Sequence, residues 1–264
     1  MTFEFDEAIA ITEPDGSVAF PERWTMGPGY AHGGYLMSVA LAGAAAISPH
    51  ADPVTMSAHF VRPCKVGVGR LRRTQVKTGR TLSTVAVDVE QNSRTAVATL
   101  ITFGDLSQAG DVAFRSVDFP TLPPLDRCVA ADRSQNPLVP RMVDNLDLRL
   151  SPESTAWTRG ETLELATMEG WVGFGDGRPI DCLALPMLAD ALPPPVFSVG
   201  AFAPWTPTIE LTVHVRRRPN GRHLAVSFRT DLIGGTFFES TGTLWNDDGS
   251  LVAMSRQLQL ISRR

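Results

Sequence analysis

The sequence has few cysteines, no excess of basic residues and no long apolar run, and each absence excludes a class of protein. Its three cysteines, Cys64, Cys128 and Cys182, show no paired spacing, which disfavours a disulfide framework and a zinc site and is typical of reduced thiols. The net charge of −4 and the lack of a sustained basic run argue against nucleic-acid binding. The longest apolar stretch, residues 35–47, is too short to cross a membrane.

Several motifs of common enzymes are also missing. There is no GxSxG motif, which disfavours a serine hydrolase, and no pair of histidines at helical spacing that indicates a metal. The glycine turns lack the lysine of a phosphate-binding loop. The start, MTFEFDEAIAI, carries acids where a secretory signal needs bases. We therefore expect a globular cytoplasmic protein without metal or cofactor, whose 264 residues suffice for one large or two ordinary domains.

The most informative feature that is present is an internal repeat. Residues 55–103 and 210–258 show the same order of strands and turns at an offset of 155 positions. Six identities occur at that offset: His59 with His214, Arg62 with Arg217, Gly79 with Gly234, Thr81 with Thr236, and Val97-Ala98 with Val252-Ala253. Average composition gives about three by chance, so the argument depends on the matching turns, strands and preceding helix. A duplicated chain holds two equivalent places for each site, and their differences show where chemistry is retained.

Each half is predicted to contain a strand, a buried helix and a run of antiparallel strands. In the first half, FEFDEAIAI and VAF are predicted to form a hairpin through the turn EPDGS. The uncharged stretch GGYLMSVALAGAAAI is predicted to be a helix that is buried on nearly every side and ends near Pro49. Four strands are expected near residues 55–62, 69–77, 82–90 and 95–103.

The same pattern restarts after a proline-rich segment. NLDLRL and ELATMEGWVGF are predicted strands, DCLALPMLADALPP a largely apolar helix, and further strands are expected near residues 208–216, 224–231, 236–245 and 251–261. A curved sheet wrapped around each helix is the simplest way to bury it, which predicts an α+β fold. We divide the chain into an N-terminal unit (1–108), a linker (109–143) and a C-terminal unit (144–264).

Asp190 is the leading candidate for chemistry. It lies in LALPMLADALPPP, an apolar segment without a basic residue, where a buried carboxylate is costly unless it is hydrogen-bonded or used. Either it is solvated at the end of the helix before Pro193, or it holds and deprotonates a water molecule.

A second candidate segment is AHGGYLM, at the start of the first helix. The N–H groups at a helix start are unpaired and carry the positive end of the helix dipole, so those of Gly33 or Gly34 suit a developing oxyanion. Tight packing of the helix start explains the two glycines equally well. We group His32, Gly33 and Gly34 as an oxyanion or substrate-binding segment.

This layout resembles the hotdog fold, and the duplication resembles the double hotdog of the acyl-CoA thioesterase II family, over nearly the whole chain apart from the linker. The resemblance implies hydrolysis of an acyl-CoA thioester by a bound water, without metal or covalent intermediate. In that family a Thr at a strand start and a Gln in a late strand hydrogen-bond to the catalytic Asp and its water. Here PTIEL and VAMSRQ place Thr208 and Gln257 at those positions, beside Asp190 in the second-half helix.

The repeat predicts a single site of this kind. Subtracting 155 from the three positions gives Tyr35, Pro53 and Thr102. None of these is a carboxylate, and Pro53 has neither a hydroxyl nor an amide hydrogen. We therefore expect one active site in each chain.

Other polar residues are assigned lesser roles. His59 and His214 recur in both halves, which favours a role in the fold. Glu210 is predicted by strand alternation to share a face with Thr208 and is the nearest rival carboxylate. The basic runs GRLRR and HVRRRP either bind the phosphates of coenzyme A or form the outer face of a sheet, and we favour the second interpretation.

The sequence thus predicts a cytoplasmic, homo-oligomeric acyl-CoA thioesterase that uses Asp190, Thr208 and Gln257. Its expected partner is the acyl-CoA substrate, with no nucleic acid and no membrane. One alternative is a catalytically inactive protein that binds acyl-CoA in the same cleft. A hotdog hydratase is less favoured, because it needs a paired His and Asp in one half.

Overall fold

Apart from the first strand of the chain, the strands expected on both sides of the linker are present, close to their predicted bounds. The computed structural model describes residues 2–11, 16–27, 29–108, 110, 112–134, 139–201 and 206–261. Their helices are α1 (Glu4–Ile9), α2 (Gly33–Ala45) and α3 (Leu185–Leu188), with short 3-10 helices η1 (Glu22–Trp24), η2 (Leu106–Gln108), η3 (Leu125–Arg127), η4 (Arg141–Asn145), η5 (Glu153–Arg159) and η6 (Pro195–Val199). Their strands are β1 (Ser17–Phe20), β2 (Thr25–Gly27), β3 (Tyr30–Ala31), β4 (Asp52–Phe60), β5 (Gly67–Thr78), β6 (Ser83–Gln91), β7 (Arg94–Gly104), β8 (Val129–Ala130), β9 (Leu146–Leu150), β10 (Ala166–Phe174), β11 (Thr208–Val215), β12 (His223–Thr230), β13 (Ile233–Gly234), β14 (Phe237–Trp245) and β15 (Leu251–Leu260).

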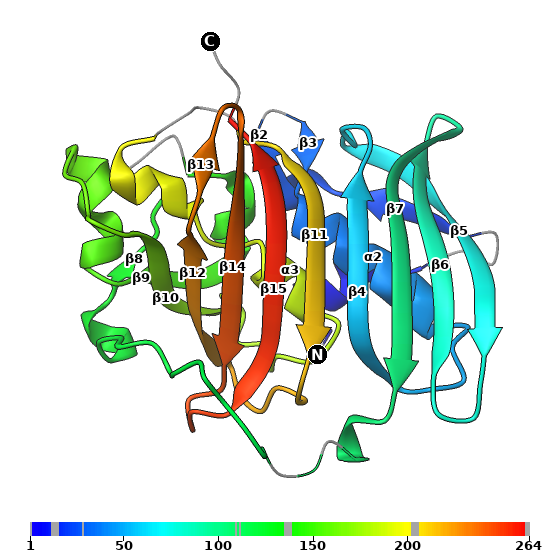
Figure 1. The fold of residues 1–264 in the computed structure, drawn as a ribbon. Coiled ribbons are helices and arrows are strands. Elements are labelled where there is room, and N and C mark those ends of the chain that lie inside the picture. Colours follow the sequence, from blue (N-terminus) through cyan, green and yellow to red (C-terminus); the bar gives the residue numbers. More distant parts are fainter. Residues whose placement is uncertain are drawn as a thin grey trace.

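The two halves form one continuous antiparallel sheet, with α2 and α3 on the same side of it (Figure 1). The strand order is β1-β5-β6-β7-β4-β11-β15-β14-β12-β10-β9-β8, and β13 pairs with β14. As predicted, the uncharged α2 is buried, with ten of its 13 residues in the buried interior. No helix in the described part of the chain is long and apolar enough to cross a membrane.

The duplication is visible where β4 and β11 join the halves. Ser57 and Thr212, which are 155 positions apart, lie opposite each other in this antiparallel pair, and their hydroxyls are hydrogen-bonded at 3.0 Å. A residue paired with its own counterpart marks a local twofold axis between the copies. Outward from this axis, the strands of the first half lie in the order β4, β7, β6, β5. Those of the second half lie in the matching order β11, β15, β14, β12. The predicted repeat of strands is therefore confirmed.

The offset between the copies changes by one residue in the last strand. Met56 pairs with Ile101 in the first half, while its counterpart Leu211 pairs with Gln257 in the second. The offset there is thus 156, because the chain between the paired Leu244 and Ala253 is one residue longer than that between the equivalent pair Val89 and Val97. The first-half counterpart of Gln257 is therefore Ile101, and the sequence alignment with Thr102 is wrong. The same shift removes the match of Val97-Ala98 with Val252-Ala253.

The start of the chain is helical, so the strand predicted for FEFDEAIAI is wrong. Helix α1 buries Phe5 and Ile9 and carries acids in its first turn. Apolar residues four positions apart are typical of one helix face rather than of a strand, and acids are favoured at a helix N-terminus. Residues 13–15 of the predicted turn EPDGS lie outside the described residues.

The second-half helix is also shorter than the predicted 181–194. Helix α3 is a single turn with Pro186 near its start, and prolines at 193–195 follow soon after it. Proline is accepted in the first turn of a helix but not in its interior, which explains the early end. Asp190 therefore lies just beyond α3 rather than within a helix.

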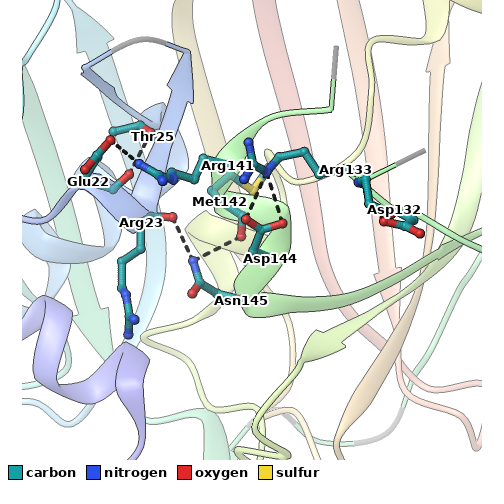
Figure 2. A network of polar contacts seen from close by, with 10 residues as sticks. Glu22, Arg23, Thr25, Asp132, Arg133, Arg141, Met142, Asp144 and Asn145 are labelled. Carbon is teal, nitrogen blue, oxygen red and sulfur yellow. Dashed lines mark hydrogen bonds and ion pairs between the residues drawn. The ribbon is translucent and has the colours of Figure 1, made fainter. Parts of the chain in front are cut away.

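The segment between the halves is attached to both of them. The part predicted as a linker contains β8, which pairs with β9, while residues 109, 111 and 135–138 lie outside the described chain. Near its end, Arg141 forms an ion pair with Glu22, and the side-chain amide of Asn145 donates to the carbonyl of Arg23 at 2.8 Å (Figure 2). These contacts hold η4 beside η1, which precedes the segment leading into α2.

An ion pair links the halves near the start of β4. Asp52, with its side chain only 8% exposed, accepts two hydrogen bonds from Arg218 at 2.7 and 2.8 Å. The hydrogen bond from Arg218, helped by the N–H of Leu106, holds the pKa of Asp52 below its usual value although burial opposes this. Because the folded pKa is lowered, the stabilisation is present above pH about 4 and is lost as the pH falls further.

We expect Asp52→Asn to lower the Tm at pH 7 by about 2 °C, a small effect because water screens the exposed guanidinium. Thermal unfolding of both proteins between pH 7 and pH 3 measures this. The difference in Tm is expected to shrink towards pH 3. A difference that grows on acidification would contradict the assignment.

Candidate active site

The start of α2 is held by His32, which caps the helix. The N–H of His32 donates to the carbonyl of Trp24 at 2.9 Å, and its ring Nδ1 accepts from the N–H of Tyr35 at 3.3 Å. Since Nδ1 is an acceptor, the neutral ring carries its proton on Nε2. Nε2 then donates to the backbone carbonyl of Asp190 at 3.0 Å. This buried histidine thus joins the first-half helix to the second-half candidate acid.

The carboxylate of Asp190 is held by donors from both halves. Its Oδ1 accepts from Nε2 of Gln257 at 2.7 Å, and its Oδ2 accepts from the backbone N–H of Gly34 at 2.8 Å. Nε2 of His32 lies 3.4 Å from the same Oδ2. The N-terminus of α2 also stabilises the negative charge. The side chain is 12% exposed, so this acid is held in a nearly closed site that water still reaches.

Thr208 joins the network through a bulge. Nε2 of Gln257 also donates to Oγ1 of Thr208 at 2.6 Å. The register of β11 against β15 shifts between Thr208 and Glu210, and one extra residue turns the neighbouring side chains to opposite faces. Glu210 instead accepts from Ser57 at 3.2 Å across the β4–β11 seam. The prediction that Glu210 shares a face with Thr208 is therefore wrong.

The two glycines of the segment differ in their surroundings. A Cβ on Gly34 would lie 2.6 Å from the carbonyl of Pro186 and 2.8 Å from Cβ of Asp190, so only glycine lets α2 start this close to α3. A Cβ on Gly33 would lie 3.0 Å from Oδ2 of Asp190 and 3.2 Å from the ring of Phe60. The N–H of Gly34 is occupied by Asp190. The N–H of Gly33 has no hydrogen-bond partner within the described residues.

The equivalent place in the first half has different chemistry. The counterpart of Asp190 is Tyr35, whose hydroxyl donates to the carbonyls of Ala8 and Ala19 at 2.7 and 3.0 Å, and burial raises its pKa well above the usual value. The counterparts of Thr208 and Gln257 are Pro53 and Ile101. A cavity of about 300 Å³ lies beside Pro53, lined there by the paired Asp52 and Arg218 described above.

The remaining candidate residues lie away from the network. His59 and His214 are exposed on the outer face, each across the β4–β11 seam from the other half. In the run GRLRR, Arg72 pairs with Asp88 and Glu90, and in HVRRRP, Arg218 pairs with Asp52. No three His, Cys, Asp or Glu side chains gather as metal ligands in the residues that the structure describes.

Five of the six residues proposed from the sequence therefore meet in one hydrogen-bonded network, and the sixth, Gly33, lies against it. The sequence did not indicate the direct bond from Gly34 to Asp190, nor the ring of Phe60 beside Gly33. A helix start facing an acid across a duplicated, helix-backed antiparallel sheet defines the class: this is a double hotdog protein.

Comparison with known proteins gives the family. Residues 20–104 match the acyl-CoA thioesterase N-terminal domain, and residues 124–261 match the acyl-CoA thioesterase C-terminal domain. The chain belongs to this acyl-CoA thioesterase family.

Two solved structures and one further protein are similar to this chain along most of its length. A Thermobifida fusca protein provisionally assigned as a thioesterase II is 30% identical, with a TM-score of 0.90 over 99% of this chain and 98% of that one. A hotdog protein of unknown function from Alicyclobacillus acidocaldarius shares the fold, at 20% identity and a TM-score of 0.86 over the whole of both chains. An uncharacterised protein of Mycobacterium tuberculosis is 26% identical over 271 residues, covering 91% of this chain and 88% of that protein.

Proposed function

We propose that this protein hydrolyses the thioester of an acyl-CoA to the free acid and coenzyme A, with Asp190 as the general base. Family membership supports the substrate class. The observation that carries the residue assignment is the Asp190 carboxylate, which accepts from Gly34 of one half and Gln257 of the other. A buried acid oriented by such donors can bind a water molecule and take its proton, while the neighbouring ring of His32 presents Nε2 to it as a donor rather than as a base.

The reaction follows from these contacts. Asp190 removes a proton from water while the water oxygen attacks the thioester carbonyl carbon. The carbonyl oxygen becomes negative and is stabilised by the N–H of Gly33 at the positive end of α2. When the C–S bond breaks, the proton on Asp190 passes to the departing thiolate. The products are the carboxylic acid and the free thiol of coenzyme A, and no metal or covalent intermediate takes part.

Gln257 and Thr208 act by positioning. Both amide hydrogens of Gln257 are engaged, one with Asp190 and one with Thr208. Because Oγ1 of Thr208 is an acceptor in this contact, its own hydrogen remains available for water or the substrate. A fixed hydroxyl beside the base holds the water on the line of attack.

Removal of the Thr208 hydroxyl tests this role. We expect Thr208→Val to lower kcat by about tenfold, because the water loses one of its contacts while Asp190 is retained. The matched control is Glu210→Gln, two residues further along on the outer face, which is expected to keep the wild-type kcat. Both are measured by thiol release from acyl-CoA. A larger loss of kcat in the Glu210 variant than in the Thr208 variant would contradict this assignment and indicate that the active site lies on the outer face of the sheet.

The division into units 1–108, 109–143 and 144–264, the cytoplasmic location and the homo-oligomeric state also belong to this proposal. Light scattering on the purified protein measures the last of these. A monomeric mass at working concentration would refute the homo-oligomeric state without affecting the catalytic assignment.

A further inference from the structure

A cationic hollow lies at the end of β4, near the candidate active site. It has a volume of about 330 Å³ and is lined by Arg62, Pro63, Gln91, Asn92, Arg94 and Ala96. These residues come from the segment after β4 and from the turn between β6 and β7. The backbone N–H groups of Val61 and Arg62 both donate to the carbonyl of Ala96, which fixes the two segments against each other.

The same segment runs beside the residues that lead into the active site. The N–H of Ala31 donates to the carbonyl of Cys64 at 2.9 Å, and Ala31 directly precedes His32. Phe60, which lies against Gly33, is two residues before Arg62, about 7 Å along an extended chain. The lining of the hollow therefore begins two residues beyond Phe60, whose ring lies against Gly33 of the site.

Within the described part of the chain, the two arginines of the hollow have no acidic partner. The guanidinium of Arg62 donates to the carbonyl of Thr95 at 2.8 Å, and neither Arg62 nor Arg94 forms an ion pair with another described residue. Both side chains are exposed. This distinguishes them from Arg72 and Arg218, whose charges are offset by neighbouring carboxylates.

The duplication supplies an internal comparison, because the backbone of this corner is built the same way in both halves. In the second half the N–H groups of Arg216 and Arg217 both donate to the carbonyl of Val252. The N–H of Lys65 donates to the side chain of Gln91 at 2.8 Å. Their counterparts, the N–H of Asn220 and the side chain of Asn246, make the same bond at 3.0 Å.

The charges of the two corners differ although the backbones match. Arg62 corresponds to Arg217, while Lys65 corresponds to Asn220 and Arg94 to Ser250. In the other direction, the uncharged residues 61 and 63 correspond to arginines at 216 and 218. The uncharged turn at residues 92–93 is replaced by the turn Asp247-Asp248-Gly249. At these positions the corner beside Asp190 thus holds three cations and no acid, whereas the corner beside Pro53 holds the three arginines at 216–218 together with Asp247 and Asp248. Arg218 is in addition paired with Asp52. The net charge of these positions is therefore +3 beside the candidate catalytic residues and +1 in the other corner.

We propose that Arg62 and Arg94 bind the phosphates of coenzyme A and thereby select coenzyme A thioesters among thioester substrates. This inference rests on the proposed function. In coenzyme A the pantetheine arm separates the thioester from the diphosphate, so a phosphate site belongs on the surface at some distance from the base. Guanidinium groups without carboxylate partners are suited to such oxygens, which they bind in pairs of hydrogen bonds.

The test compares two thioesters of the same acyl group, acyl-CoA and acyl-N-acetylcysteamine, which lacks every phosphate. For the double variant Arg62→Gln, Arg94→Gln we expect KM for acyl-CoA to rise about 100-fold, roughly tenfold for each charge-assisted contact. We expect kcat to stay within about twofold, because neither arginine contacts the reacting atoms. Hydrolysis of acyl-N-acetylcysteamine is expected to be unchanged, and adenosine 3′,5′-bisphosphate to inhibit only the wild type.

The matched control is Arg217→Gln, the counterpart of Arg62, which is expected to leave both substrates unaffected. If the wild type hydrolyses both thioesters and the double variant keeps its KM for acyl-CoA, the phosphate site is refuted while the proposed function stands. An equal rise in KM for both thioesters also refutes it, since the effect then does not act through phosphate. If the wild type hydrolyses neither thioester, the proposed function itself has failed.

Discussion

Asp190→Asn is expected to lower kcat for acyl-CoA hydrolysis by at least about a hundredfold, the contribution typical of a positioned acid or base. The substitution keeps the shape of the side chain and removes its ability to take a proton. It also replaces one acceptor oxygen by an NH₂ group. In the wild type both carboxylate oxygens of Asp190 are acceptors, one from Gly34 and one from Gln257. The amide of Gln257 can turn over to meet the new donor, so the fold is expected to survive.

The measurement is thiol release at saturating substrate, with the Tm of each protein recorded beside it. Asp181→Asn is the matched control, because Asp181 is the other acid of the same segment and pairs with Arg178 rather than with the network. It is expected to keep the wild-type kcat. Equal activity of wild type and Asp190→Asn would mean that another group activates the water.

Gly34→Ala is expected to cost about 2 to 3 kcal/mol of stability and to reduce hydrolysis as severely as loss of the acid. The added methyl would lie 2.6 Å from the carbonyl of Pro186 and 3.0 Å from Cα of Met187. These are backbone atoms, so α2 and α3 must move apart, at a cost near the upper end of that for overpacked cores. Their separation also breaks the bond from the N–H of Gly34 to Asp190.

Gly33→Ala is the matched control for that experiment. Its methyl would meet the tips of two side chains, Asp190 and Phe60, which can shift without moving backbone. We expect the unfolding free energy to stay within about 1 kcal/mol of wild type, with a loss of kcat because the carboxylate is displaced. Urea unfolding separates the two variants. If Gly34→Ala is as stable as wild type, the close contact between the helices is not a feature of the protein.

The strands and the repeat could be predicted from the sequence because their signals are local. Alternating apolar residues between glycine and asparagine turns indicate the strands, and the uncharged stretch before Ser48 indicates a buried helix. The gathering of Asp190, Thr208 and Gln257 was anticipated only through the family resemblance, since they are up to 67 positions apart and no local pattern joins them.

The errors in the predicted face of Glu210 and in the predicted counterpart of Gln257 both come from shifts of a single residue. The bulge that separates Thr208 from Glu210 is one extra residue, and strict alternation places both on the same face. The longer turn before β15 changes the counterpart of Gln257 in the same way. Helix α1 was missed because Phe3 and Phe5 alternate as in a strand, while the pair that is buried is Phe5 and Ile9.

The asymmetry between the halves has a physical basis. Both copies keep the strands, because the seam between β4 and β11 needs two matching edges. The acid, the hydroxyl and the amide occur in one copy, where the N-terminus of α2 faces them. The other copy holds Tyr35, Pro53 and Ile101 at those places, which pack but cannot hold a water-activating base.

The most direct test is thiol release by the wild-type protein from a panel of acyl-CoAs of short, long and aromatic acyl groups. We expect saturable hydrolysis of at least one member, and the panel then identifies the acyl group that the protein accepts. Binding of acyl-CoA without any thiol release would contradict the hydrolytic assignment. It would leave a protein of this family that binds acyl-CoA and does not cleave it.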